Sequence, residues 1–519
     1  MSSVEGAPVE LRPTQKRQMH LNFFETACNG SHMCTGQWKD PNDNSRYKDR
    51  LEYYIWLAKL ADKGKITSIF FADGYGLMST YQGKPDATFR GGSMVAYLDP
   101  VVLISAMAAV TKSVAFGITG STSYINPFIL ARTWSTLDHV TRGRIAWNVV
   151  TSYSNSAAQA MGFDKVRPSE ERYKAAHEYM DLVYQLWEKS WEDGAVTWQA
   201  EPEMAYDPDK IHKIDFDGEF HRCHAYHQTH PSPQRTPVIF QAGASKSGID
   251  FAGKHGEAIY TDNMTFESLT SYVKDVRAAA VKYGRDPYDV KIFVAIMPFL
   301  GRTLEEAQEK YRKAEALVSV QSGLAKMCGF TGLDLSKYPY KEPFTLEAQA
   351  GDGVITGVIK NFNLRLKESS EPLTPEKIGQ MAGFINTPAP IGTPEMVADV
   401  FQEWMDKTDV DGFNLVYVSN PMSYEDIVEL LVPELQKRKL MWSDYTVPGG
   451  TYRENLHNTP GDSYLNARHP GSKYKWNKQT EGTDTKAETN GTTVKPEIVV
   501  PVMSESSPAM QAQAQEVAA

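Results

Sequence analysis

The feature that most constrains the fold of this chain is a regular alternation between short runs of β-branched and aromatic residues and longer stretches with helical spacing. Such an alternation is typical of βα units whose strands form a parallel sheet. About eight of these units follow one another, which is the number that a closed (β/α)8 barrel requires. The strands are expected at residues 20–24, 68–73, 114–121, 144–151, 237–242, 257–261, 290–300 and 412–418. The sequence therefore predicts an α/β fold, a (β/α)8 TIM barrel with insertions.

Two stretches interrupt the alternation, residues 193–237 and residues 327–372. We interpret both as insertions at the rim of the barrel, where loops shape substrate pockets. Residues 215–220 in the first insertion are predicted to form a hairpin turn. A long helix is expected over residues 170–192, because Pro168 and two glutamates are favourable at a helix start.

The chain is expected to divide into three parts. Residues 1–18 form a flexible N-terminal segment, and residues 19–444 form the barrel domain with its two insertions. Residues 445–519 are a C-terminal extension in which the periodicity stops. This extension is rich in Pro, Gly, Thr, Ser and Gln, a composition that predicts partial disorder, although its first part is able to lie over the barrel.

The bulk composition excludes several classes of protein. The formal net charge is -10 over 519 residues and no long basic run is present, so nucleic acid is not an expected partner. The N-terminal segment is polar and resembles neither a signal peptide nor a membrane anchor. The four cysteines are scattered and form no CxxC pair, which favours reduced thiols. We therefore expect a cytoplasmic protein that binds neither membranes nor nucleic acid.

Polar residues that close an apolar strand are the candidates for function, because barrels of this kind build their active site at the carboxyl ends of the strands. The second strand ends at Asp73, the third carries Thr119 near its end, and the fourth contains Asn148 within an apolar run. Each has a structural alternative: a turn or helix cap for Asp73, local backbone hydrogen bonding for Thr119, and a place among the outer helices for Asn148.

The fifth strand runs into a turn of small residues over positions 242–248, which contains Ser245 and is followed by a helix. Small residues there leave backbone amides free at a helix N-terminus, which is where anions bind. On its own, a Gly-Ala-Ser turn is weak support for a phosphate site.

Five segments together are similar to one family of enzymes. They are HLNFF at residues 20–24, FAD ending at Asp73, WNVVTS at residues 147–152, ERY at residues 171–173, and SPQRTP at residues 232–237 running into QAGAS at residues 241–245. In order and spacing, this set resembles the flavin-dependent monooxygenases of the bacterial luciferase-like superfamily, and within it the group of nitrilotriacetate monooxygenase component A and dibenzothiophene-sulfone monooxygenase. The resemblance covers residues 20–438.

This resemblance implies a noncovalent FMN site at the mouth of the barrel. The cofactor-binding residues that it implies are Asp73, Thr119, Asn148, Ser169, Tyr173 and Ser245. Ser245 would bind the phosphate, and Asn148 would lie beside the isoalloxazine ring. The resemblance identifies no catalytic acid or base.

The resemblance also implies a two-component reaction. A separate NAD(P)H-dependent flavin reductase would supply reduced FMN (FMNH2), which would react with O2 and oxygenate a small organic substrate. The chain has no recognisable dinucleotide-binding glycine motif after a strand, in agreement with a separate reductase. A homo-oligomer, either a dimer or a tetramer, is expected by the same resemblance.

One residue departs from the family pattern. Family members often have a histidine four residues before the helix tyrosine, and this chain has Ser169 there. A hydroxyl still donates a hydrogen bond, but it does not titrate near neutral pH as an imidazole does.

The sequence leaves three alternatives open. Four histidines and one cysteine within residues 221–230 are possible metal ligands, but they lack a fixed spacing and lie in a rim insertion, so no metal site is predicted. A deazaflavin-dependent barrel oxidoreductase would share the fold and transfer hydride without oxygen. The third alternative is a non-catalytic flavin-binding barrel. Flavin binding together with oxygen consumption would distinguish a monooxygenase from the deazaflavin enzyme and from the non-catalytic barrel.

Overall fold

The centre of the fold is a closed barrel of eight parallel strands, in the order β1-β16-β13-β12-β11-β6-β5-β3. The computed structural model describes residues 17–30, 32–262, 265–343, 373–384 and 387–476. The barrel strands are β1 (His20–Glu25), β3 (Ser68–Phe71), β5 (Ala115–Ser121), β6 (Ile145–Val150), β11 (Val238–Gln241), β12 (Ala258–Thr261), β13 (Lys291–Ile296) and β16 (Gly412–Val416). Each lies within or beside a predicted strand, so the predicted (β/α)8 barrel is confirmed.

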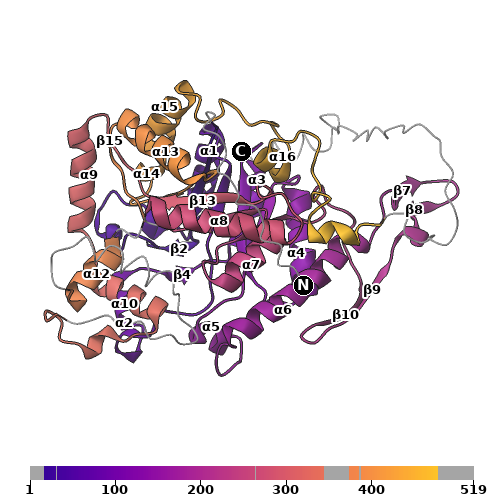
Figure 1. Ribbon diagram of the computed structural model, residues 1–519, viewed down its shortest axis with the longest axis horizontal. Coiled ribbons are helices and arrows are strands. Elements are labelled where there is room, and N and C mark those ends of the chain that lie inside the picture. Colours follow the sequence, from indigo (N-terminus) through magenta and orange to yellow (C-terminus); the bar gives the residue numbers. More distant parts are fainter. Residues whose placement is uncertain (1–16, 31, 263–264, 344–372, 385–386, 477–519) are drawn as a thin grey trace, which may run out of the picture. The chain divides into compact units, whose positions relative to one another are not determined.

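Helices surround the barrel on its outside (Figure 1). They include α1 (Leu51–Lys63), α3 (Pro100–Ala109), α4 (Pro127–Val140), α6 (Ser169–Tyr184), α7 (Lys246–His255), α8 (Phe266–Lys282), α9 (Leu304–Ala316) and α13 (Pro394–Thr408). Asp99 and Asn126 cap α3 and α4 by accepting hydrogen bonds from backbone N–H groups, and a proline follows each cap. The helix predicted over residues 170–192 is shorter: after α6 the chain makes a π-helical turn that ends at Lys189.

Aromatic side chains fill the interior of the barrel. The Phe70 ring on β3 stacks on the Tyr260 ring on β12 with centroids 4.2 Å apart, and these strands are not neighbours in the barrel, so their side chains meet inside it. Phe240 on β11 contacts the same Tyr260 ring at 5.1 Å. Residues in register on adjacent parallel strands point to the same side, and Phe240 is in register with Asn148. Asn148 therefore points into the barrel and not toward the helices.

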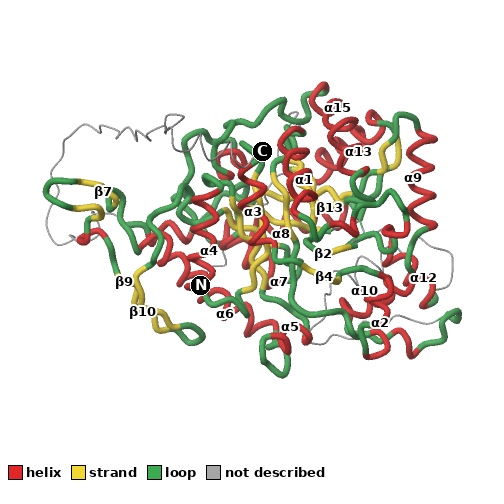
Figure 2. Tube along the Cα trace, turned by 180° about the vertical axis from the view of Figure 1, so that it is seen from behind, coloured by secondary structure: helices red, strands yellow, loops and turns green. Residues whose placement is uncertain are grey.

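Three helices lie together over the carboxyl ends of the strands, and we call α2 (Asp86–Gly91), α10 (Val320–Thr331) and α12 (Pro375–Phe384) the cap (Figures 1 and 2). The cap contacts segments that follow the strands: a Cβ built at Gly329 of α10 would overlap Met78, which follows β3. The second predicted insertion, residues 327–372, begins inside α10. Its residues 344–372 lie outside the described part of the chain.

The first insertion contains two antiparallel hairpins that project away from the barrel on the side opposite the cap (Figures 1 and 2). They are β7 (Val196–Gln199) with β8 (Met204–Tyr206), and β9 (Lys213–Asp217) with β10 (Arg222–Tyr226). The hairpin predicted around residues 215–220 is thus confirmed.

The first part of the C-terminal extension covers the amino ends of the strands. Its helix α16 (Tyr452–His457) places Arg453 against Glu257, with Nε and Oε1 2.6 Å apart. Arg453 also donates to the carbonyl oxygen of Thr236, and the backbone N–H of Tyr452 donates to that of Gly143. These three partners precede β12, β11 and β6. The predicted disorder at the end of the chain concerns residues 477–519, which lie outside the described residues.

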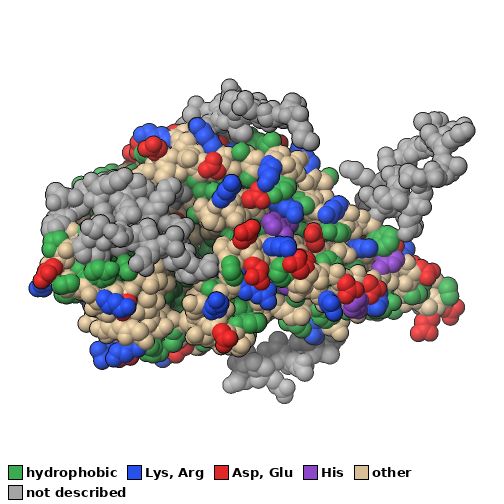
Figure 3. Space-filling model, turned by 60° about the horizontal axis from the view of Figure 1, so that its bottom comes forward, with side chains coloured by type: hydrophobic (Ala, Val, Ile, Leu, Met, Phe, Trp, Pro, Cys, Tyr) green, Lys and Arg blue, Asp and Glu red, His purple; other side chains and the backbone are tan. Residues whose placement is uncertain are grey.

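Three features of the described residues bear on the expected location and partners of the protein. None of their helices is both long enough and apolar enough to cross a membrane. All four cysteines are free and buried. On the face drawn in Figure 3, basic and acidic side chains are interspersed and do not gather by sign.

Candidate functional site

Two predicted residues meet inside the barrel near the carboxyl ends of its strands. Asn148 on β6 donates through Nδ2 to Thr119 Oγ1 on β5 at 2.9 Å, and Thr119 Oγ1 donates to the carbonyl oxygen of Phe71 at 3.0 Å. Asn148 Oδ1 is buried and has no hydrogen-bond partner. Buried polar atoms rarely stay unpaired. The site therefore offers an open acceptor to a ligand with an N–H or O–H group.

The turn between β11 and α7 is ordered by side chains. Gln241 Oε1 accepts a hydrogen bond from the backbone N–H of Gly243 at 2.6 Å. Ser245 is the N-cap of α7 and accepts from the backbone N–H of Gly248 at 3.1 Å. Ser245 and the residues beside it are exposed, so the N-terminus of α7 is open to an anion.

Tyr173 joins α6 to this turn. Burial raises the pKa of Tyr173, and the polar side chains of Ser245, Gln241 and Thr151 near its hydroxyl oppose that shift. A Cβ built at either Gly243 or Gly248 would lie 3.0 Å from the Tyr173 hydroxyl. The fold thus brings Tyr173 next to the turn that carries Ser245, although the two residues are far apart in the sequence.

The remaining two predicted residues are less tightly joined to the others. Ser169 is the first residue of α6 and is half-buried, one helical turn before Tyr173, and so lies on the same side of that helix. No hydrogen bond links it to the other five candidates in the described part of the chain. Asp73 follows β3 and is half-buried; burial, and to a lesser extent Asp99, raises the pKa of Asp73 to about 6.

The raised pKa of Asp73 predicts a pH-dependent stability. Near pH 4 the unfolded chain begins to lose this proton while the folded protein keeps it up to about pH 6. The free energy of unfolding should therefore fall as the pH rises from about 4 to about 6. Asp73→Asn should remove this component, as measured by urea denaturation across the range, whereas Asp164→Asn, at an exposed position, should retain it. Parallel pH profiles for wild type and Asp73→Asn would contradict the assignment.

Some residues of the site were not predicted. Gln241 was part of the sequence resemblance, but its role in holding the turn depends on contacts that only the structure supplies. Gly248 belongs to the predicted turn of small residues, but its close approach to Gly243 and Tyr173 was not predicted.

The histidine-rich stretch does not converge on one point. His221 packs against the Tyr179 ring, His224 pairs with Asp215, and His227 hydrogen-bonds Ser135. Among the described residues, no group of three or more His, Cys, Asp or Glu side chains is placed to hold a metal ion.

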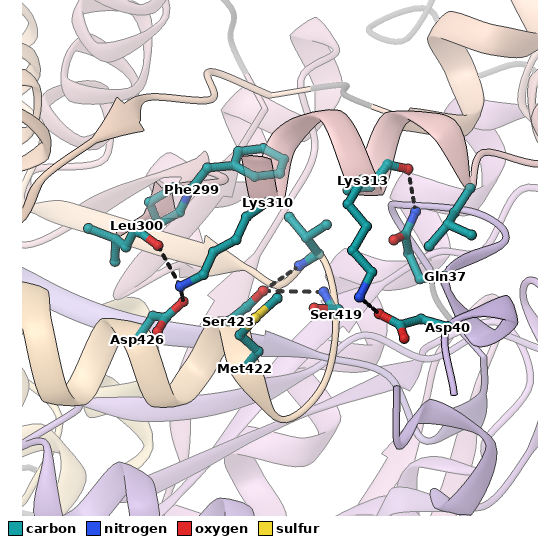
Figure 4. A pocket seen from close by; sticks show the side chains of 14 residues that line it. Gln37, Asp40, Phe299, Leu300, Lys310, Lys313, Ser419, Met422, Ser423 and Asp426 are labelled. Atoms are coloured by element: carbon teal, nitrogen blue, oxygen red, sulfur yellow. Dashed lines mark hydrogen bonds and ion pairs between the residues drawn. The ribbon is translucent and has the colours of Figure 1, made fainter. Parts of the chain in front are cut away.

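A small cavity lies between α9 and the segment after β16, apart from the strand-end residues (Figure 4). Its volume is about 20 Å³, room for roughly one water molecule. Lys310 Nζ at its edge is 2.7 Å from Asp426 Oδ2, and Lys313 pairs with Asp40. Because the cavity is small and these lysines are paired, it is not a ligand site.

Comparisons with known proteins place this geometry in context. The model of the family described as luciferase-like monooxygenase matches residues 19–411. The long-chain alkane monooxygenase of Geobacillus thermodenitrificans is 41% identical over 85% of this chain and 94% of its own length. The dimethyl-sulfide monooxygenase of Hyphomicrobium sulfonivorans is 37% identical over 89% of this chain and 94% of its own length. A solved structure of riboflavin lyase, with modified FMN and riboflavin, has a TM-score of 0.81 and 32% identity, covering 89% of this chain and 100% of that one.

Proposed function

We propose a function from the premise that this chain belongs to the luciferase-like monooxygenase family and is a flavin-dependent monooxygenase. It uses reduced FMN and O2 to oxygenate a small organic substrate at the carboxyl end of its barrel. The observation that carries the choice of cofactor is the pairing of an open helix N-terminus at Ser245 with the unpartnered Oδ1 of Asn148. A phosphorylated flavin matches both features, because its dianionic phosphate would bind at the helix N-terminus and its polar ring system would hydrogen-bond Asn148.

The residues present fit this cofactor. Ser245 and the first backbone N–H groups of α7 would hold the phosphate, since helix N-termini favour negative charge. Asn148 Oδ1 would accept a hydrogen bond from the ring, while its Nδ2 remains fixed on Thr119. The riboflavin lyase structure, which was solved with modified FMN, supports the same choice. When bound, reduced flavin supplies the activation of oxygen.

The protein's own residues would orient the cofactor and exclude water. Tyr173 and Gln241 fix the turn that carries Ser245, so the phosphate site is formed before the ligand arrives. Phe24 and Phe70 line the interior below the mouth with rings 5.9 Å apart and keep that volume apolar. Asp73, with its raised pKa, is the group best suited to hold or release a proton near neutral pH.

The partners follow from the same proposal. A separate NAD(P)H-dependent reductase would supply the reduced flavin, as the resemblance to component A of a two-component enzyme implies. The alkane and sulfide substrates named for two relatives are small and organic, and we propose a small organic substrate here. We also propose a homo-oligomer, a dimer or a tetramer, on the family resemblance alone.

The test is reconstitution of the purified chain with FMN, a flavin reductase, NADH and a panel of alkanes, sulfides and carboxylates. We expect saturable binding of reduced FMN and substrate-dependent oxygen uptake with an oxygenated product. Strict dependence on a deazaflavin without oxygen uptake would favour the hydride-transfer alternative, and absence of any flavin binding would favour a non-catalytic barrel.

Ser245→Ala should weaken binding of reduced FMN. Loss of one hydrogen bond to a charged group costs about 1.5–3 kcal/mol, which corresponds to roughly 10- to 100-fold in Kd. Ser247→Ala, two residues along the same exposed helix start, is the matched control and should bind normally. Anaerobic titration followed by fluorescence measures both, and equal affinity in the two variants would show that the phosphate lies elsewhere.

A further inference from the structure

A histidine and a lysine meet above the barrel, on the opposite side of its mouth from Ser245. His32 follows β2 (Cys28–Asn29), and its ring lies 5.3 Å from the ring of Phe24 on β1. Phe24 in turn contacts Phe70 in the interior. Lys326 on α10 of the cap donates to the carbonyl oxygen of Met33 at 3.2 Å. The two side chains are therefore next to the interior of the barrel at its carboxyl end.

Lys326 is buried without a counter-charge. Its exposed fraction is 5%, and the Met33 carbonyl is its hydrogen-bond acceptor. No carboxylate pairs with it in the described part of the chain. Lys310 and Lys313, by contrast, each have an acidic partner (Figure 4). An ammonium group that is removed from water without an anion is costly, and such a cost is normally offset by a partner.

His32 adds an unused polar atom to the same place. Its Nδ1 is buried and has no hydrogen-bond partner. Burial, followed by the charges of Lys326 and Lys48, lowers the pKa of His32 to about 3, so the ring is neutral near pH 7. Burial also lowers the pKa of Lys326 to about 8, and Cys34 is the titratable group that opposes this shift.

The barrel topology separates this pair from the proposed phosphate site. β1 and β11 are four strands apart in either direction around the closed barrel. The phosphate at the β11–α7 turn and an anion at Lys326 would therefore lie on opposite sides of the mouth. A flavin phosphate held at Ser245 therefore does not serve as the anionic partner of Lys326.

We propose that Lys326 and His32 bind an anionic group of the substrate, a carboxylate or a sulfonate. This inference rests on the proposed function and narrows its substrate class to molecules with an apolar body and one anionic end. The apolar body would extend from Lys326 toward Phe24 and the flavin. An unsubstituted alkane or a dialkyl sulfide has no anionic group that could pair with the ammonium group of Lys326.

The test compares octanoate with 1-octanol, which share a chain and differ in charge. Isothermal titration calorimetry on the full chain, with and without saturating FMN, should give at least about tenfold tighter binding of octanoate. A tenfold difference corresponds to about 1.4 kcal/mol, close to the lower limit of about 1.5 kcal/mol for one charge-assisted hydrogen bond. Lys326→Met should abolish this preference. Lys310→Met, at a lysine that already has acidic partners, is the control and should retain it.

A second measurement does not depend on any variant. In NMR spectra of the wild type labelled with 13C at the lysine ε-carbon, octanoate or octanesulfonate should raise the titration midpoint of Lys326. Equal affinities for octanoate and octanol, a preference that survives in Lys326→Met, or no change in the Lys326 titration would each overturn the inference. FMN affinity, measured on the same samples, reports separately on the proposed function.

Discussion

Arg453→Met is expected to lower the free energy of unfolding by about 3–5 kcal/mol and to leave the affinity for reduced FMN unchanged. Arg453 and Glu257 are 3% and 5% exposed, and the guanidinium also donates to the carbonyl oxygens of Thr236 and Ser463. Removing the guanidinium leaves the Glu257 carboxylate buried without its cation. A buried charge without a partner destabilises the folded protein. The pair lies at the amino ends of the strands, far from the proposed flavin-binding residues at the carboxyl ends.

Arg468→Met is the matched control for this prediction. Arg468 lies in the same C-terminal segment and pairs with Asp286 and Asp289 at 3.7 and 3.6 Å, but it is mostly exposed. Such surface pairs contribute about 0–1 kcal/mol. Chemical denaturation followed by tryptophan fluorescence measures both variants, and adding Glu257→Gln to Arg453→Met should recover part of the loss. An effect of Arg453→Met no larger than that of Arg468→Met would show that α16 does not stabilise the barrel.

Gly248→Val should lower the affinity for reduced FMN by about 100-fold, because it separates α7 from the turn that Tyr173 fixes. A Cβ at Gly248 would be 2.9 Å from Gly243 Cα and 3.0 Å from the Tyr173 hydroxyl, distances too short for the backbone to stay in place. Overpacking of this kind costs about 1–3 kcal/mol, and the upper part of that range corresponds to about 100-fold in affinity.

Ser247→Val introduces the same side chain one residue earlier, at an exposed position, and should bind flavin nearly as well as wild type. Thermal unfolding of both variants separates a local effect on the turn from a general loss of fold. Normal flavin affinity in a folded Gly248→Val would remove the β11–α7 turn from the site.

The barrel was predictable because buried parallel strands appear in a sequence as short apolar runs between helical stretches. The C-terminal cover was not, since α16 has only six residues and its main ionic partner, Glu257, is 196 residues away from Arg453. A local signal was present nonetheless: Thr451 and Glu454 form a capping box, which a search for helix starts detects.

Strand ends pointed to Asp73, Thr119 and Asn148, because parallel strands bring their carboxyl ends to one rim. The direction of Asn148 required the register between β6 and β11, which sequence alone does not give. Lys326 was missed although it interrupts an apolar helical segment. A lysine there is equally consistent with a solvated or paired side chain, and its burial without an acidic partner is visible only in the folded protein.

The attachment of α16 to the base of the barrel has a consequence for biosynthesis. Glu257 leaves the ribosome before Arg453, which is 196 residues later, so the nascent barrel has a carboxylate at its base without this cation until Arg453 has been synthesised. Any truncation upstream of Arg453 leaves Glu257 permanently without this cationic partner. Purification tags and fusion partners at this end of the polypeptide therefore belong after Trp476, where the described packing ends.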